Sequence, residues 1–245
     1  MILEVLYEDN HCLAINKPAG LPSQRDETGS ESLVDVVSAY LKERYGKPGN
    51  VYVGLLHRLD RPTSGVVLIA RTSKGAGRLS AQFRAGTIAK VYWAIVEGGP
   101  AENEGEWVDR VQKDRPLNRS RIAGEEEVAE GKDARVTFRV LQRWTDATKL
   151  ELRPRTGRSH QLRVQLAGRG MPIVGDTKYG AMTRIMARDG RPRIALHARE
   201  LTFNHPTRGE AIVVEAQVPT DWPEPWKSRP GRQSGSSRRG GRSSP

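Results

Sequence analysis

The sequence HRLDRPTSGVVLIART, from His57 to Thr72, joins a charged loop to an apolar run. The run from Val66 to Ala70 is rich in branched apolar residues, which predicts a buried strand. In front of it, Pro62 and Gly65 favour an irregular backbone, and Asp60 stands between two arginines. Loops held by rigid strands often carry reactive groups, so Asp60 is a candidate catalytic carboxylate. A structural ion pair is the alternative interpretation.

Short apolar segments separated by turns lie on both sides of this stretch. Their patterns predict strands at 2–7, 11–16, 51–56, 65–71, 89–98, 105–111, 134–144, 149–155, 193–203 and 209–219. Helical spacing predicts helices at 30–46, 73–85 and 158–170. Residues 112–133 are polar and predict a loop, of which 124–133 is expected to be mobile. Because strands joined by short turns predominate, we expect an α+β fold with a mixed, mainly antiparallel sheet and flanking helices.

The charge of the chain points to a polyanionic partner. Its 245 residues carry a net charge of +11. Residues 227–245 hold six basic residues and no acid, which leaves about +5 on residues 1–226. The terminal segment is rich in Gly, Ser and Pro, so we expect a disordered basic tail that contacts phosphate, or else merely keeps the chain in solution. No composition change divides residues 1–226, which we expect to form one domain.

The remaining composition excludes several classes of protein. No run approaches the roughly 20 apolar residues of a membrane helix, and the N-terminus has acids where a signal peptide has basic residues. We therefore expect a soluble, cytoplasmic protein. Cys12 is the single cysteine, so it cannot form an internal disulfide, and its apolar surroundings predict a buried, inert thiol.

A second basic stretch, RPRTGRSHQLR, runs from Arg153 to Arg163. A glycine turn with arginines before a helix start suits phosphate binding, although a solvated basic turn is an equal alternative. Arg163 lies one turn into the helix among apolar residues. A partly buried arginine needs an anion, and Asp60 is its natural partner.

A third segment, AKVYWAIVEG, predicts a strand in which Tyr92 and Trp93 face opposite sides of the sheet. We expect one of them to join the core; the other is available to stack on a base, although core packing for both is the alternative. The sequence has no glycine-rich loop of Rossmann or Walker spacing. The histidines at 57, 160, 197 and 205 are scattered, so we expect no metal site.

Together and in order, these segments resemble the RluA-type family of RNA pseudouridine synthases. The segments that carry the resemblance are NKPAGLPSQ, HRLDRPTSGVVLIAR, KVYWAIVEG, RTGRSHQLRVQLAGRGMPIVGDTKYG and LHARELTFNHP, within residues 2–219. The resemblance implies the pseudouridine synthase fold around a central cleft, and isomerisation of uridine to pseudouridine in structured RNA without a cofactor. It does not choose between ribosomal and transfer RNA. We further expect a monomer with no obligatory protein partner.

The resemblance also assigns roles. Asp60 matches the catalytic aspartate, Tyr92 the active-site tyrosine and Arg163 the arginine that pairs with the aspartate. Leu196 matches a small apolar wall and Arg58 an arginine that holds the RNA open. The remaining predicted substrate contacts are His57, Arg155, Arg158, His160 and Gln161. Whether Asp60 acts as a nucleophile at the sugar or as a base stays open.

The sequence departs from the family pattern in two places, at Gln165, where many members have histidine, and at the long segment 182–192. It also begins directly on the catalytic pattern, so we expect no N-terminal S4-type domain. Two other functions were weighed. An inactive RNA-binding relative would have lost the aspartate or the tyrosine. A nuclease or glycosidase generally needs a second carboxylate or a metal, and apart from Asp60 we expect no acid near Arg163.

Overall fold

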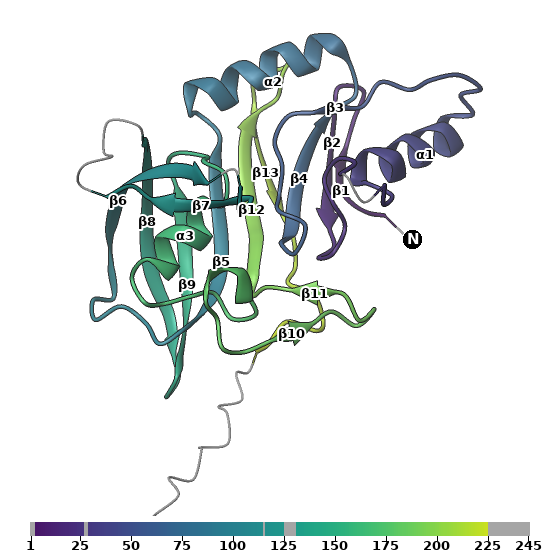
Figure 1. The fold of residues 1–245 in the computed structure, drawn as a ribbon. Helices are drawn as coiled ribbons and strands as arrows, with labels where there is room; N and C mark the ends of the chain where they lie inside the picture. The colour runs from purple at the N-terminus through teal and green to yellow at the C-terminus, as the bar shows by residue number, and fades with distance from the viewer. Residues whose placement is uncertain (1–2, 27–28, 115, 125–130, 225–245) are drawn as a thin grey trace, which may run out of the picture.

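The structure is a computed structural model that describes residues 3–26, 29–114, 116–124 and 131–224 (Figure 1). Within this part of the chain, eleven strands form one sheet in the order β1-β2-β4-β12-β5-β9-β8-β6-β7, with β3 on β4 and β13 on β12. The strands are β1 (Glu4–Glu8), β2 (Cys12–Lys17), β3 (Gly54–Leu55), β4 (Ser64–Ala70), β5 (Ala89–Glu97), β6 (Glu104–Asp114), β7 (Arg119–Ile122), β8 (Lys132–Arg143), β9 (Ala147–Pro154), β12 (Leu196–Asn204) and β13 (Ala211–Glu215). Strands β4 and β12 pair in parallel, and the other described neighbours pair antiparallel. The mixed, mainly antiparallel α+β class is confirmed.

Strand β4 lies inside the sheet and is buried along its whole length. Val67 and Ile69 belong to the apolar cluster that contains residues of α1 (Leu33–Tyr45). Val66 and Leu68 belong to the cluster that contains Leu79 of α2 (Ser73–Ala85). Alternate side chains of one strand therefore fill two cores, each fully buried side chain contributing roughly 1.5–3 kcal/mol. Both faces of this half of the sheet are covered.

Both long helices begin and end where the sequence supplies caps. The hydroxyl of Ser32 accepts the Asp35 N–H, and the Asp35 carboxylate accepts the Ser32 N–H, which forms a capping box at the start of α1. The hydroxyl of Thr72 caps α2 with a single hydrogen bond, which it accepts from the Gly75 N–H. Gly46 follows α1 at a φ of +57°, a left-handed conformation that favours glycine.

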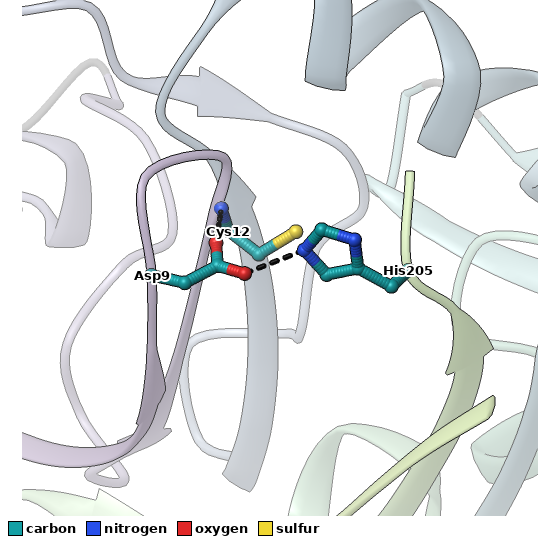
Figure 2. A group of neighbouring side chains, drawn as sticks. All are labelled: Asp9, Cys12 and His205. Carbon is teal, nitrogen blue, oxygen red and sulfur yellow. Dashed lines mark hydrogen bonds and ion pairs between the residues drawn. The ribbon is translucent and has the colours of Figure 1, made fainter. Parts of the chain in front are cut away.

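The turn between β1 and β2 is closed by one carboxylate (Figure 2). Oδ1 of Asp9 accepts the backbone N–H groups of His11 and Cys12, both at 2.8 Å. Its other oxygen accepts a hydrogen bond from Nε2 of His205, which follows β12. Asp9 thus ties the first hairpin to a strand nearly two hundred residues later in the chain.

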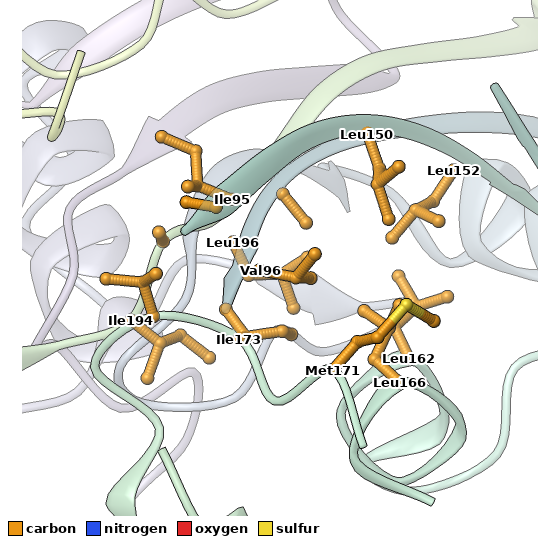
Figure 3. Packing of buried hydrophobic residues seen from close by; sticks show 14 of the residues in the cluster. Ile95, Val96, Leu150, Leu152, Leu162, Leu166, Met171, Ile173, Ile194 and Leu196 are labelled. Atoms are coloured by element: carbon orange, nitrogen blue, oxygen red, sulfur yellow. The ribbon is translucent and has the colours of Figure 1, made fainter. Parts of the chain in front are cut away.

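Helix α3 (Gln161–Ala167) covers the other half of the sheet (Figure 3). Leu162 and Leu166 pack with Leu150 and Leu152 of β9 and with Met171. This packing fixes the rotation of the helix. Residues 161–166 are all buried, and the arginine at position 163 is therefore enclosed together with its apolar neighbours.

Gly65 permits the close parallel contact between β4 and β12. Its φ is +117°, and an added Cβ would lie 2.7 Å from the carbonyl carbon of Ala198. No side chain fits there, so a residue with a Cβ would push the two strands apart. The same glycine is the second residue of β4, directly after the loop that carries Asp60, which couples the position of that loop to the centre of the sheet.

The prediction of a loop over residues 112–133 is wrong in part. Strand β6 continues to Asp114, and β7 occupies Arg119–Ile122. These segments are mostly exposed or half-buried, so they lack the apolar alternation that identifies a strand in sequence. Their pairing with each other and with the long strand β8 supplies the backbone hydrogen bonds instead. The mobile loop predicted at 124–133 lies largely outside the described residues.

Two further predictions concern the ends and insertions of the chain. Segment 182–192 forms much of a small hairpin of β10 (Ile185–Met186) and β11 (Pro192–Arg193), separate from the main sheet. The predicted basic tail at 227–245 lies outside the described residues. Among the helices that are described, none has the length and apolar character needed to cross a membrane.

Candidate active site

Asp60 lies on the loop between β3 and β4, and backbone groups hold this loop in place. The N–H of Gly20 donates to the carbonyl of Arg61 at 2.7 Å, and Nε of Arg61 returns a bond to the Gly20 carbonyl at 3.1 Å. The hydroxyl of Ser23 bonds both the N–H and the carbonyl of Leu59. The N–H of Thr63 donates to the carbonyl of Asp60, which closes a turn. The carboxylate is therefore presented by a rigid loop.

A buried lysine, Lys17, also holds this loop through hydrogen bonds to backbone carbonyls. Nζ of Lys17 donates to the carbonyls of Pro18 at 2.9 Å and Leu21 at 2.8 Å, and reaches the Arg61 carbonyl at 3.4 Å. The side chain is fully buried, and burial lowers the pKa of its amine to about 7. The hydrogen bonds of the Lys17 amine thus fix the conformation of the segment NKPAG.

Arg163 joins Asp60 to a second acid. Nη1 of Arg163 lies 2.9 Å from Oδ2 of Asp60. Nε and Nη2 of Arg163 donate to the two oxygens of Asp176 at 2.7 and 2.8 Å. Burial disfavours a charged guanidinium, but the bonds and charges of Asp176 and then Asp60 outweigh it and raise the pKa of Arg163. The predicted contact between Asp60 and Arg163 is present.

Asp176 was missed, and the expectation of no acid near Arg163 apart from Asp60 is wrong. It comes directly after Gly175, nine residues past the end of α3, and is 1% exposed. An acid directly after an apolar run and a glycine, a few residues past a helix with an enclosed arginine, is the sequence signal that could have identified it. Both of its oxygens are occupied by Arg163, so Asp176 is not available as a second acid–base group.

Tyr92 lies near Asp60, and Trp93 faces the other side of the sheet. Tyr92 packs against two apolar clusters, one containing Leu162 of α3 and one containing Leu59 of the Asp60 loop. Burial, followed by the charge of Asp60, raises the pKa of its phenol. The ring of Trp93 is covered by Nζ of Lys149 at 4.1 Å and by the guanidinium of Arg199 at 5.1 Å. Tyr92 and Trp93 therefore lie on opposite faces of β5, as the two-residue period of a strand requires.

His160 stands directly before α3 and close to Asp60. Its Nε2 lies 3.8 Å from Oδ1 of Asp60, and its Nδ1 lies 2.8 Å from the hydroxyl of Tyr179. Tyr179 also places its ring against the guanidinium of Arg163, 4.9 Å from the ring centre. Burial is the main reason that the pKa of His160 is lowered, and the positive charge of Arg163 acts in the same direction. Sequence reasoning missed Tyr179.

Three residues predicted to contact the substrate make contacts inside the protein instead. Nε2 of His57 accepts the Leu68 N–H at 2.9 Å, its ring packs against Phe83 of α2, and burial lowers its pKa to about 3. Gln161 closes the preceding turn by accepting from the hydroxyl of Thr156 at 2.8 Å and by donating to a backbone carbonyl. Leu196 is buried in the apolar cluster of Figure 3. These placements favour structural roles.

The predicted arginine contacts are at the surface. Arg58, Arg155 and Arg158 are all exposed. Nε of Arg158 donates to the Asp133 carbonyl at 2.8 Å, and Arg155 lies 3.8 Å from a carboxylate oxygen of Glu106. Both leave guanidinium N–H groups available to a polyanion.

The departure at Gln165 affects packing. Its side-chain amide donates to Asp109 of β6 at 2.7 Å and to the Ala134 carbonyl at 3.2 Å, and the residue is fully buried. Gln165 therefore connects α3 to strands β6 and β8.

Asp9, Cys12 and His205 form a cluster of metal-ligand residue types (Figure 2), with donor atoms all within 4.8 Å of one another. Nδ1 of His205 accepts backbone N–H groups, including that of Arg208 at 3.0 Å, so the proton of a neutral ring is on Nε2. A metal-bound histidine needs the opposite arrangement, with a donor on its second nitrogen. Burial also raises the pKa of the Cys12 thiol to about 12. These contacts fit a structural hydrogen-bond network and do not fit a metal ion.

Comparison with known proteins decides the family. A model of the family described as RNA pseudouridylate synthase matches residues 11–168, which include the Asp60 loop, Tyr92 and Arg163. The chain belongs to the RNA pseudouridylate synthase family. The expectation of an RluA-type enzyme is thereby confirmed, as the names of its curated relatives also indicate.

Curated relatives of this pseudouridylate synthase match over most of their length. This chain is 37% identical over 231 residues to ribosomal large subunit pseudouridine synthase D of Xanthomonas campestris pv. campestris, and the match covers 89% of this chain and 67% of the relative. It is 35% identical over 240 residues to tRNA pseudouridine synthase C of Yersinia pestis, covering 92% and 89%. Among solved structures, human RNA pseudouridylate synthase domain containing 4 aligns with a TM-score of 0.71 and 25% identity, covering 89% of this chain and 90% of that chain.

Proposed function

We propose that the protein isomerises uridine to pseudouridine in structured RNA, with Asp60 as the catalytic group. The observation that carries this proposal is the contact of 2.9 Å between Asp60 and a buried arginine that is itself anchored, with Tyr92 nearby, in a chain of this family. In the reaction, the bond between N1 and C1′ breaks and a bond between C5 and C1′ forms. The proton lost from C5 balances the proton gained at N1. Nothing is oxidised and no phosphoryl group moves, so the proposed reaction needs no metal or cofactor.

Asp60 supplies the carboxylate that acts on the sugar. Arg163 donates a hydrogen bond to one of its oxygens, Oδ2, and leaves Oδ1 without a guanidinium partner. That free oxygen is suited to attack C1′ as a nucleophile or to remove the 2′ proton on a route through a glycal. The two routes differ in the fate of the 2′ hydrogen. A substrate deuterated at C2′ gives a primary isotope effect on the second route alone.

Tyr92 holds the base while it is detached from the sugar. Its ring lies between the α3 cluster and the Asp60 loop, where a uracil turned over after cleavage needs a flat apolar contact. Burial and the charge of Asp60 raise the pKa of the phenol, so the hydroxyl is protonated in the resting site. The assignment predicts that Tyr92→Leu loses more activity than Tyr92→Phe.

The substrate we propose is ribosomal or transfer RNA, because relatives are named for each. A uridine within structured RNA must leave its stack to reach Asp60, at a cost of a few kcal/mol. The exposed arginines Arg58, Arg155 and Arg158 offset that cost through contacts with phosphate. We propose that the protein acts as a monomer, which sedimentation of the protein with and without RNA will test.

The test of the function uses the purified protein with a chelator and no added cofactor. Uridine-labelled ribosomal and transfer RNA from cells lacking the gene is incubated with protein, and nucleosides are identified by mass spectrometry. The wild-type protein is expected to form pseudouridine, and Asp60→Asn to form none while RNA affinity changes less than about threefold. Asp189→Asn, an acid in an exposed ion pair, is the matched control and keeps full activity. Product formed by Asp60→Asn would move the chemistry to another residue.

A further inference from the structure

We propose that His160 is a positioning residue for Asp60, and that Tyr179 holds it as the neutral tautomer with the proton on Nε2. This inference rests on the function proposed above, because it assigns a second donor to the catalytic carboxylate. Three groups from three parts of the chain take part: the hydroxyl of Tyr179, the ring of His160 and the free oxygen of Asp60.

The hydrogen bonds around Tyr179 determine the tautomer. The backbone N–H of Ser120 donates to the hydroxyl oxygen of Tyr179 at 2.8 Å. Among the described residues, Nδ1 of His160, also at 2.8 Å, is the acceptor for the hydroxyl proton of Tyr179. Nδ1 therefore accepts, and a neutral ring carries its hydrogen on Nε2. Asp60 selects the same tautomer, because a lone pair on Nε2 would face a carboxylate oxygen 3.8 Å away.

The backbone of His160 indicates that the ring position matters more than helix stability. Its φ is +52°, in the left-handed region that residues other than glycine rarely adopt. It occupies the N-cap position of α3, yet its side chain makes no capping hydrogen bond. Serine, threonine, aspartate or asparagine would cap the helix better. Instead the side chain is turned toward Tyr179 and Asp60.

The arrangement leaves Asp60 asymmetric. Oδ2 is held by Arg163 at 2.9 Å, whereas Oδ1 faces the His160 N–H across 3.8 Å, which is longer than a hydrogen bond. Oδ1 is therefore oriented but free to act on the sugar. A small movement of the ring completes the bond when the carboxylate needs a second donor.

The groups packed around His160 keep the ring neutral. Arg163 on α3 and Lys178 beside Tyr179 disfavour the imidazolium, while Asp60 and Asp176 favour it, and burial is the largest influence. A cationic ring would pair tightly with Oδ1 and reduce its reactivity. The neutral ring orients the carboxylate without neutralising it.

The first experiment compares variants at His160 in single-turnover reactions. His160→Gln keeps an N–H donor of similar reach, whereas His160→Met has similar length and no donor, and both face the same left-handed backbone. We expect Met to lower the maximal rate roughly 10- to 100-fold with the RNA concentration for half-maximal rate changed less than about threefold. Gln is expected to recover most of that loss. Equal rates for Gln and Met, once thermal melts show both are folded, would overturn the proposal.

The second experiment does not depend on activity. Nitrogen-15 NMR of the histidine rings in the full chain reports the tautomer and the pKa of His160 directly. We expect the Nε2–H tautomer in the wild type and a growing share of the Nδ1–H tautomer in Tyr179→Phe. Asp60→Asn removes the nearby anion and is expected to lower the pKa of His160 further. An Nδ1–H ring in the wild type, or a His160 pKa insensitive to Asp60→Asn, would overturn the proposal.

The two experiments separate this inference from the proposed function. A wild-type protein that forms pseudouridine while His160→Met reacts at the wild-type rate contradicts the positioning role and leaves the function intact. A wild-type protein that modifies no RNA, but whose NMR spectra show the expected tautomer and coupling to Asp60, contradicts the function and supports the contact.

Discussion

Asp176 holds Arg163 more completely than Asp60 does. It accepts from Arg163 at 2.7 and 2.8 Å with a side chain 1% exposed, whereas Asp60 accepts once, at 2.9 Å, with a side chain 29% exposed. One acid thus neutralises the buried cation and fixes its orientation. Asp60, the catalytic carboxylate proposed above, is held by the same guanidinium through one oxygen. The two carboxylates therefore differ in burial and in the number of hydrogen bonds that they accept from Arg163.

The first prediction concerns the stability of this anchor. Asp176→Asn leaves a guanidinium in the interior with its main negative partner removed, which typically destabilises a protein by about 3–5 kcal/mol. Asp60→Asn removes a half-exposed partner while Asp176 remains, so a loss of less than about 1 kcal/mol is expected. Urea unfolding of the two variants measures the difference. Equal unfolding free energies would show that Arg163 does not depend on Asp176.

Much of this site was predictable because the sequence determines local geometry. The apolar neighbours of Arg163 required it to be enclosed, and an enclosed arginine required an anion, which led to Asp60. The periodic helices α1 and α2 also occur where their patterns place them. Tyr92 and Trp93 occupy opposite faces because a strand has a period of two.

The missed features depend on partners that local patterns do not specify. Asp176 meets Arg163 only because the turn after α3 folds back on the helix, and Tyr179 meets His160 through the same turn. Strand β7 has no apolar alternation and exists through pairing with β6. His57 resembled a substrate contact by its place in the sequence, but its ring nitrogen is used by a backbone N–H. The type of a residue indicates which hydrogen bonds and ion pairs it can make, but the tertiary fold decides which residue is its partner.

A second prediction compares two glycines. Gly65→Ala places a Cβ 2.7 Å from the Ala198 carbonyl carbon at a φ of +117°, so the β4–β12 contact must open. A loss of more than roughly 3 kcal/mol is expected, because both strain and a lost backbone contact contribute. Gly77→Ala, inside α2 with nothing within 4 Å of the new Cβ, should stabilise the protein by up to about 1 kcal/mol. Thermal melts of both variants test this, and a tolerated Gly65→Ala would contradict the geometry.

A third prediction concerns acid unfolding. His197 is fully buried, with Ser64 Oγ at 2.9 Å from Nδ1 and the Ala216 carbonyl at 3.1 Å from Nε2. Burial is the main reason that its pKa falls from 6.5 to about 4. The unfolded chain therefore binds a proton more readily than the folded chain between pH 6.5 and 4. His197 thus stabilises the fold above pH 6.5, and roughly 3 kcal/mol of that contribution is lost as the pH falls through this window.

The variant His197→Gln separates this contribution from that of other groups. It is expected to be less stable than the wild type at pH 7, because the packing of the ring is lost. Its unfolding free energy should nevertheless fall less steeply between pH 6.5 and 4. The slope that remains includes His57, whose pKa burial lowers to about 3, and His160, whose pKa burial also lowers. Identical slopes in urea titrations of the two proteins would show that His197 is not the group that responds.

The final prediction concerns residues 227–245, which carry six basic residues and no acid. If this segment contacts RNA phosphates, deleting it removes the share of counterion release that its contacts contribute to RNA binding. The plot of the logarithm of the binding constant against the logarithm of salt concentration then becomes shallower, by about 0.7 per lost contact on single strands. Pseudouridine formation at saturating RNA should persist, because Asp60, Tyr92 and Arg163 are retained. As the matched control, a variant with all six basic residues changed to glutamine keeps the length of the segment and should show the same shallow slope. An unchanged slope in both proteins would assign RNA binding entirely to residues 1–226.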